Sequence, residues 1–303
     1  MMRLPLVVGV DGSDSSLQAV DWAADEAVRD ADLPLRLVHA SLWEQYEGDM
    51  PSTGDPGPAH PAAADRIVTA ATARALRRAP AVRVESVVLE EDPVYALLRE
   101  GHNATAVVTG CRGRGKIPGL LLGSVGLAVA GRADGPVIVV RGGPAGAAGP
   151  YERIVLAVGE PGTSGEAARF ALCEAAARHC ALDVLRTWLC PAHRAARHAL
   201  LVGDRGHGYE ERAVTPTTCE EQASALVDDV LRHPMSEYPQ VRVHRCVLEG
   251  PARKVLLDRS GAADLLVLGV RRRNGDEGLH LGLVAHTLLH HALCPVAVVP
   301  DFP

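Results

Sequence analysis

Short apolar runs alternate with longer stretches of helical periodicity along the first half of the chain. Residues 6–10 form an apolar run, and residues 35–39 form the next one. Between them, residues 14–28 place apolar side chains at the spacing of an amphipathic helix, with Ser13 or Asp14 available as its N-cap. This alternation predicts parallel strands joined by helical crossovers, and therefore a sheet covered on both faces.

The same order continues through the rest of this half. The pattern predicts a helix, a strand and a second helix, at 62–78, 82–89 and 93–101. Residues 46–61, rich in Pro and Gly, interrupt the order and are predicted to form a loop, as are residues 191–216 in the second half.

The apolar runs of the first half recur in the second half, offset by about half the chain. The runs at 6–10, 106–110 and 137–140 are matched by those at 154–158, 265–269 and 296–299. A stretch composed of Gly, Pro and Ala separates the two copies and is typical of a linker. We therefore expect a first domain over residues 1–142, a linker over 143–150 and a second domain over 151–303.

The closing apolar runs, 137–140 and 296–299, would be exposed edges if each domain formed a separate sheet. We predict that the two domains pair through these edges and form an internal pseudo-dimer with twofold character. The sequence leaves open whether two whole chains form a homodimer.

Composition narrows the class of protein. Apolar residues make up 47% of the 303 residues and aromatic residues 3%, which predicts an aliphatic core. The net charge of −6 argues against a nucleic-acid partner, because no clustered basic surface is available for phosphates. No apolar run approaches the roughly 18 to 20 residues of a membrane span, and the N-terminus is predicted to enter a strand instead of a signal peptide. Seven cysteines without a CxxC pair indicate no disulfide framework, so a cytoplasmic location is expected.

The segment over residues 110–124 is the most informative one for function, because it follows a predicted strand and leads into a predicted helix. Its glycines lack a Cβ, so their main-chain N–H groups can converge on an anion. Ser124 adds a hydroxyl group where the helix begins, a position that favours a phosphate. Arg112, Arg114 and Lys116 bring positive charge to the same loop. The segment therefore predicts a phosphate-binding loop.

The spacing G-x2-G-x9-G-S, made by Gly110, Gly113, Gly123 and Ser124, resembles the ATP-binding signature of the universal stress protein family. The first and last apolar runs of this half also resemble that family's first and last strands. The resemblance covers essentially the whole chain as a tandem pair of the actinobacterial type. It implies an α/β fold with two tandem open parallel-sheet domains, which are Rossmann-like and adenine nucleotide alpha hydrolase-like.

The resemblance also implies an adenine nucleotide as the ligand, namely ATP with or without Mg²⁺. Asp11 corresponds to the acidic residue near the adenine or ribose, and Val10 and Gly12 flank it. Val38 and His39 end the second predicted strand, where the family lines the adenine slot. The residues that correspond to the phosphate and ribose loop are Gly110, Gly113, Gly123, Ser124 and Val125, with Arg112 adding positive charge.

The second copy departs from this signature at three positions. The differences are Gly159 for Asp11, Arg272 for Gly113 and Leu283 for Ser124. An arginine side chain blocks the close approach that glycine allows, and a leucine side chain donates no hydrogen bond. We therefore expect the second site to be empty or altered.

Simpler interpretations stand beside these. The glycine-rich loop could serve chain reversal alone, Asp11 could be a turn residue, and His39 is favoured as a pocket-wall residue over a catalytic base. In the second copy, His286 and His290 share a helical face by their i,i+4 spacing and could bind a metal ion. His280, His291 and Cys294 lie close in sequence, but no third ligand supported by a carboxylate is apparent nearby, so an interface or solvent-facing helix is the favoured interpretation.

The chain carries no G-x-S-x-G elbow and no H-E-x-x-H motif, and Ile117 follows Lys116 where a Walker loop requires Ser or Thr. At most slow ATP hydrolysis is expected without a positioned general base. The main hypothesis is a nucleotide-responsive regulatory or protective module that meets an unknown protein partner, with a role in stress or growth arrest implied by the resemblance. A weak ATPase or nucleotide-dependent enzyme, and a structural interaction protein with unused pockets, remain as alternatives.

Overall fold

The computed structural model describes residues 3–29, 33–41, 61–112, 123–141, 151–189, 216–271 and 281–301. Its first half contains β1 (Leu6–Gly9), α1 (Asp14–Arg29), β2 (Leu35–Ala40), α3 (Pro61–Arg78), β3 (Val84–Leu89), α4 (Pro93–Gly101), β4 (Ala106–Gly110), α5 (Ser124–Ala130) and β5 (Val137–Val140). The strands and helices expected from the apolar pattern are confirmed, with ends that shift by up to two residues. Pro61 begins α3 and is not part of a loop; the rest of the predicted loop, 46–60, falls outside the described residues.

Among the described residues, the second half repeats this order with one additional short helix. Its elements are β6 (Arg153–Ala157), α6 (Gly165–Ala177), β7 (Ala181–Trp188), α8 (Pro216–Arg232), α9 (Pro234–Glu237), β8 (Val243–Glu249), α10 (Ala252–Ser260), β9 (Leu265–Arg271), α11 (Leu283–His291) and β10 (Val296–Asp301). The predicted loop 191–216 and the predicted linker 143–150 lie outside the described residues, apart from Pro216, which begins α8.

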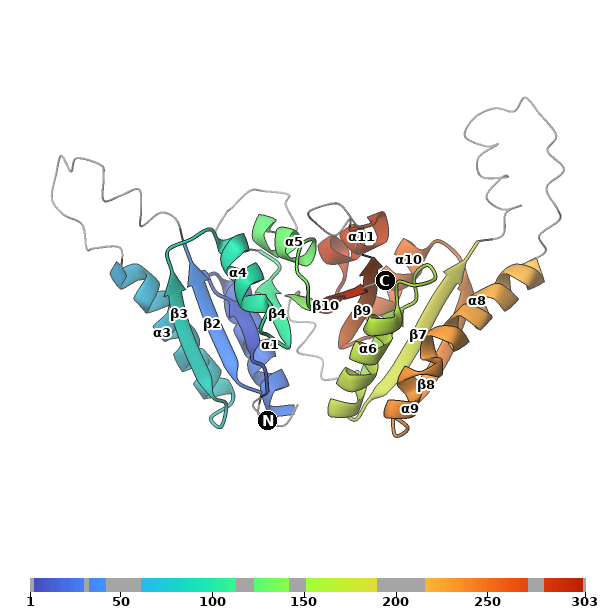
Figure 1. Ribbon diagram of the computed structural model, residues 1–303, viewed down its shortest axis with the longest axis horizontal. Helices are drawn as coiled ribbons and strands as arrows, with labels where there is room; N and C mark the ends of the chain where they lie inside the picture. The colour runs from blue at the N-terminus through green and yellow to red at the C-terminus, as the bar shows by residue number, and fades with distance from the viewer. Residues whose placement is uncertain are drawn as a thin grey trace, which may run out of the picture.

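The strands form one open sheet in the order β3-β2-β1-β4-β5-β10-β9-β6-β7-β8. Neighbouring strands are parallel within each half, and β5 pairs with β10 in the antiparallel direction. Figure 1 shows the two halves on opposite sides of this central join. The predicted fold, two tandem parallel-sheet α/β domains that form an internal pseudo-dimer, is confirmed.

Each face of the sheet packs against helices because successive strand residues point to opposite sides. Leu6 and Val8 belong to one buried cluster, which includes α1 and α3, whereas Val7 belongs to the other, which includes α4 and α5. Val7 and Val8 are fully buried, as expected for a central strand. The continuous apolar runs of the sequence therefore reflect burial on both faces.

The central join consists of residues that are almost fully buried. Val137 lies opposite Val298, and Val139 lies opposite Val296. Each of these side chains has at most 1% of its surface exposed. Each closing strand thus covers the apolar edge of the other, as the sequence predicted.

We expect the main-chain amides at the centre of β5 and β10 to be among the slowest to exchange with deuterium in the native protein. Their hydrogen bonds break only when the two halves separate or unfold, whereas the outer strands β3 and β8 open more readily. Hydrogen exchange followed by mass spectrometry tests this with β3 and β8 as internal references. Labelling of β5 or β10 as fast as β3 would show that the join is absent in solution.

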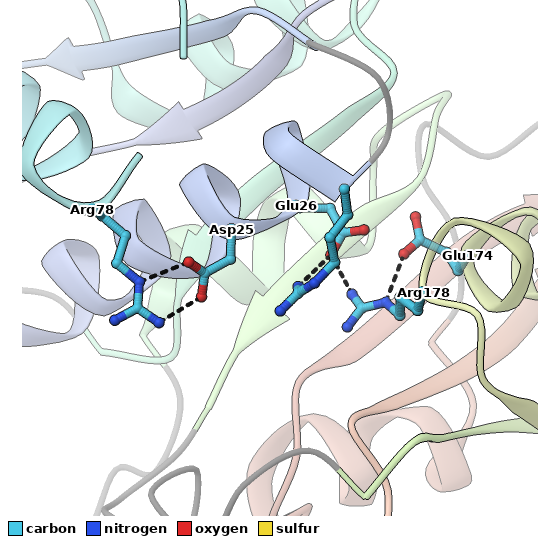
Figure 2. Close-up of polar contacts among 6 residues, drawn as sticks. Asp25, Glu26, Arg78, Glu174 and Arg178 are labelled. Carbon is cyan, nitrogen blue, oxygen red and sulfur yellow. Dashed lines mark hydrogen bonds and ion pairs between the residues drawn. The ribbon is translucent and has the colours of Figure 1, made fainter. Parts of the chain in front are cut away.

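Charged side chains also cross the boundary between the halves. Glu26 of α1 contacts the guanidinium group of Arg178, which follows α6, and Arg178 Nε lies 3.3 Å from Glu174 Oε2 (Figure 2). Only 3% of the Glu26 side chain, 9% of Arg178 and 14% of Glu174 are exposed. Arg29 adds a second guanidinium 3.4 Å from Glu26. We call these four residues the interdomain ion cluster.

Arg141, just after β5, makes a further contact between the halves. Its Nε donates to the carbonyl oxygen of Ala292 at 3.2 Å, and its Nη1 donates to that of Leu289. These carbonyl groups lie at the C-terminal end of α11, where a positive charge is favourable. The interaction fixes α11 against the first domain.

Across the described segments of the chain, no helix is both long enough and apolar enough to cross a membrane.

Candidate functional site

The carboxyl ends of β1 and β2 bring three predicted site residues together. The main-chain N–H of Val10 donates to the carbonyl oxygen of Val38 at 2.9 Å. His39 Nδ1 lies 2.7 Å from the carbonyl oxygen of Val10, and because a carbonyl only accepts, Nδ1 carries the proton. His39 is 7% exposed. The imidazole is therefore held as part of the wall at the end of the strands.

Asp11 and Gly12 form a turn between β1 and α1. Asp11 Oδ1 accepts from the main-chain N–H of Ser13 at 3.0 Å and from its hydroxyl group at 2.6 Å. Ser13 Oγ in turn accepts from the N–H of Ser16 at 3.2 Å, which caps α1. Gly12 has φ +79°, a conformation that favours glycine. The carboxylate is thus fixed in position at the carboxyl edge of the sheet.

Both ends of the predicted phosphate loop are held next to this turn. The N–H of Gly123 donates to the carbonyl oxygen of Cys111 at 2.7 Å, and the N–H of Arg112 donates to Ser15 Oγ at 2.9 Å. Ser124 follows as the first residue of α5 and is exposed, and Val125 is partly buried. Gly113 lies outside the described residues. The two ends of the loop therefore lie together, and Arg112 contacts Ser13 and Ser15 at the start of α1.

Gly110 has a packing role that the sequence did not reveal. A Cβ at this position would lie 2.5 Å from the carbonyl carbon and oxygen of Ser15, at the start of α1. In the second half, a Cβ at Gly269 would lie 1.7 Å from the carbonyl oxygen of Thr163. Both glycines let the first helix of a domain approach its central strands. The recurrence of glycine in both copies was the one sequence signal for this role.

The equivalent site in the second domain is a cavity of about 790 Å³. It lies between the carboxyl ends of β6, β7 and β9 and the N-terminal ends of α10 and α11. Gly159 stands where the first half has Asp11, and the register of β6 with β7 places Arg186 where the first half has His39. Arg186 Nη1 donates to the carbonyl oxygens of Val158, at 3.2 Å, and Gly159, at 2.6 Å.

The charge at the base of the site therefore differs between the two copies. The first copy presents a carboxylate and an imidazole, and the second presents a guanidinium group. Comparison of the glycine signature in the two copies did not identify Arg186. Alignment of residues 182–187 with residues 35–40 would have placed Arg186 at the position equivalent to His39. Arg272 lies outside the described residues, and Leu283 begins α11 with 65% of its surface exposed.

The histidines of α11 stack on one another. The ring centroids of His286 and His290 are 4.4 Å apart, which matches their predicted common face. Burial and the neighbouring His286, Arg141 and His291 lower the pKa of His290. Within the described ranges, no group of three or more His, Cys, Asp or Glu side chains could hold a metal ion. The contacts of Arg141 with the end of α11 place this helix at the interface between the halves.

Comparisons with known proteins cover both halves of the chain. The family model of the universal stress protein family matches residues 2–141 and 150–300. A universal stress protein of Mycobacterium tuberculosis is 30% identical over 323 residues, which cover 99% of this chain and 97% of that protein. The crystal structure of a universal stress protein from Archaeoglobus fulgidus is 15% identical with a TM-score of 0.65, and 98% of each chain is covered.

A solved universal stress protein in complex with cAMP is 31% identical, with a TM-score of 0.35, over 46% of this chain and 98% of that one. The family model and the mycobacterial relative both extend over the two halves described above. The chain belongs to the universal stress protein family and contains two of its domains in tandem.

Proposed function

We propose that the first domain binds ATP and that the chain acts as a nucleotide-responsive regulatory or protective module in stress or growth arrest. The observation that carries the proposal is the convergence of Asp11, His39 and both ends of the 110–124 loop at one edge of the sheet. In open α/β sheets, ligands bind at the carboxyl ends of the strands. The geometry of the described residues fits that rule.

Each site residue receives a role in this proposal. Val10, Val38 and His39 form the wall beside the adenine, and Asp11 accepts a hydrogen bond from the ribose or adenine, with Gly12 giving the turn its shape. Main-chain N–H groups of the loop and the Ser124 hydroxyl group bind the phosphates. The loop residues assigned to the phosphates and ribose are Gly110, Arg112, Gly113, Gly123, Ser124 and Val125. In this proposal Mg²⁺ binds together with the phosphates, and no protein ligand is assigned to it.

The described contacts favour binding over catalysis. His39 Nδ1 is occupied by the carbonyl oxygen of Val10, and Asp11 Oδ1 is occupied by Ser13. A general base has to reach the attacking water with a free acceptor atom. Slow hydrolysis of bound ATP is compatible with this arrangement, and rapid turnover is not expected.

Replacing Asp11 by asparagine is expected to weaken ATP binding at least about tenfold, because a hydrogen bond to a charged group contributes about 1.5 to 3 kcal/mol. Asparagine keeps the oxygen that Ser13 needs, so the turn is retained. Isothermal titration calorimetry measures the affinity and the stoichiometry, which we expect to be one ATP per chain. Asp14→Asn is the matched control, since Asp14 is exposed in the first turn of α1 and carries the same charge.

Failure of the unaltered protein to bind ATP would overturn the proposal, as would equal affinities of the two variants. Hydrolysis at many turnovers per second, lost in Asp11→Asn while binding persists, would replace it with an ATPase.

A further inference from the structure

The second-domain cavity is large enough for a small organic ligand. Its volume of about 790 Å³ lies within the range of roughly 300 to 1,000 Å³ that ligand pockets occupy. It occupies the carboxyl edge of β6, β7 and β9, where ligands of open α/β sheets bind. Of the three positions that depart from the signature in the second copy, Gly159 lines this cavity, and the cavity remains open.

The walls of the cavity are largely aliphatic. Six elements, β6, β7, α8, α10, β9 and α11, contribute apolar side chains, which include Leu185, Leu226, Leu256, Leu268 and Val284. Trp188 adds an aromatic ring at the end of β7. Burial of apolar ligand surface against such walls contributes about 25 cal/mol per Å². The cavity therefore favours a ligand with an apolar body.

One charged group, Arg186, lies at the base of this apolar space. Its Nη1 is used by the carbonyl oxygens of Val158 and Gly159, which orient the guanidinium plane. Among the residues that the structure describes, the partner of Nη2 is Glu160 Oε1 at 3.4 Å, and 79% of the Glu160 side chain is exposed. An exposed pair of this kind contributes little, so the positive charge of Arg186, itself only 20% exposed, is poorly neutralised. An acceptor on a ligand can therefore compete with Glu160 for Nη2.

Other features of the cavity also favour negative charge. Arg271, at the end of β9, is among its lining residues. The helices α10 and α11, nine residues each, begin at the cavity, and their N-caps Pro251 and Gly282 make no side-chain capping hydrogen bond. The N-terminal end of a helix favours an anion. All of these groups donate hydrogen bonds or carry positive charge.

The side chains next to the end of the first strand differ between the two domains in whether they accept or donate hydrogen bonds. Asp11 accepts hydrogen bonds, whereas Gly159 offers no side chain and Arg186 only donates. The hydroxyl and amino groups of a nucleoside need acceptors, and the second domain lacks the counterpart of Asp11. The carboxylate of Glu160, which lines the cavity, is 79% exposed and lies against Arg186. A ligand that presents oxygen acceptors at this point gains a charge-assisted hydrogen bond.

We propose that the second-domain cavity binds an organic carboxylate with an apolar body, an aliphatic or aromatic acid, and that it does not bind an adenine nucleotide. The carboxylate accepts from Arg186 Nη2, and the hydrocarbon part packs against the aliphatic walls. Bidentate or charge-assisted contacts of this kind are the usual way in which arginine recognises carboxylates. The site is separate from the proposed ATP site, so each is tested independently.

Calorimetry on the full chain with saturating ATP tests the proposal, with octanoate and 2-naphthoate as separate arms for aliphatic and aromatic acids. We expect one acid per chain in at least one arm, and no detectable binding of octanamide, which matches octanoate in shape and lacks the charge. Arg186→Gln is expected to weaken binding of the acid at least about tenfold, as for the loss of a charged hydrogen bond. Its affinity for ATP is expected to change less than twofold.

A second variant keeps the test independent of the folding of Arg186→Gln. Gly282 lines the cavity with φ −60° and ψ 164°, which any residue adopts, and a Cβ there meets no atom within 4 Å. Gly282→Phe is therefore expected to fill the cavity, abolish acid binding and leave the circular dichroism spectrum unchanged. Leu283→Phe is the matched control, because Leu283 is the next residue, is exposed and does not line the cavity.

Three outcomes would overturn the proposal. They are the absence of binding in both arms, equal binding of octanoate and octanamide, and a second ATP per chain that competes with the acid. The last outcome would identify the cavity as a nucleotide site. Loss of ATP binding with retention of acid binding would instead count against the proposed function of the first domain alone.

Discussion

Replacing Gly269 by alanine is expected to destabilise the second domain by about 3 kcal/mol or more, because the added methyl group overpacks a rigid contact. The new Cβ would lie 1.7 Å from the carbonyl oxygen of Thr163, 2.8 Å from its carbonyl carbon and 3.1 Å from the Cα of Ser164. All three are backbone atoms, so no side chain can rotate away to relieve the overlap. The start of α6 would have to move away from β9.

Chemical denaturation followed by circular dichroism measures this loss of stability. Gly282→Ala makes the same chemical change in the same domain, and its Cβ meets no atom within 4 Å. This control is expected to remain within about 1 kcal/mol of the unaltered protein, a cost that reflects the poorer N-cap that alanine provides. Gly110→Ala, whose Cβ would lie 2.5 Å from the backbone of Ser15, is expected to destabilise the first domain for the same reason. Equal denaturation midpoints for Gly269→Ala and Gly282→Ala would contradict the packing role.

The second large effect is a fall in the free energy of unfolding as the pH rises from about 4.5 to about 8. Burial raises the pKa of Glu174 from 4.5 to about 8, the negative charge of Glu26 raises it further, and Arg178 opposes the shift. Between these two pKa values the folded protein binds a proton that the unfolded chain releases. The stability from this group is therefore fully present below the unfolded pKa and is lost as the pH rises through the folded one.

For one proton, the free energy of unfolding falls by up to about 1.4 kcal/mol per pH unit within this window. Glu26 and Arg178 of the interdomain ion cluster lie beside this carboxyl group (Figure 2). Arg29, the fourth member, contacts Glu26. Burial raises the pKa of the nearby Cys180 thiol to about 11, so this thiol stays neutral across the window. Within the cluster, the change with pH is therefore assigned to the carboxyl group of Glu174.

Denaturation midpoints at several pH values between 4.5 and 8 test this assignment. Glu174→Gln removes the ionisable group, so its profile is expected to be flatter than that of the unaltered protein and its stability higher at pH 8. Glu166→Gln is the control, because Glu166 lies on the same helix with 49% of its side chain exposed. If Glu174→Gln retained the pH dependence of the unaltered protein, another group would have to be responsible.

Most of the fold was predictable because it depends on local pattern. The run from Leu6 to Val10 is apolar at every position except Gly9 since the central strand is buried on both faces, and the closing strands had to cover each other. The N-terminal end of α1 followed from Ser13 and Asp14, the two candidates for its N-cap. These features can be predicted from residues that are close in sequence or from a motif that recurs in both halves.

Contacts between distant residues were not predictable in the same way. Glu26 and Arg178 are 152 residues apart, and only the packing of α1 near α6 brings them together. The role of Gly110 depends on its distance from Ser15, which no spacing of glycines encodes. In the candidate site, Asp11 and His39 were predicted from the family resemblance, but the hydrogen bond that fixes the His39 tautomer became apparent only from the position of the Val10 carbonyl group.

The join between β5 and β10 has a consequence for how such a protein can diversify. In a homodimer of single domains, every substitution occurs twice, at both symmetric positions. Here both closing strands belong to one polypeptide, so Asp11 and His39 persist in one half while Gly159 and Arg186 occupy the other. Covalent fusion thus lets natural selection act on each crevice separately while the two remain in a fixed one-to-one ratio.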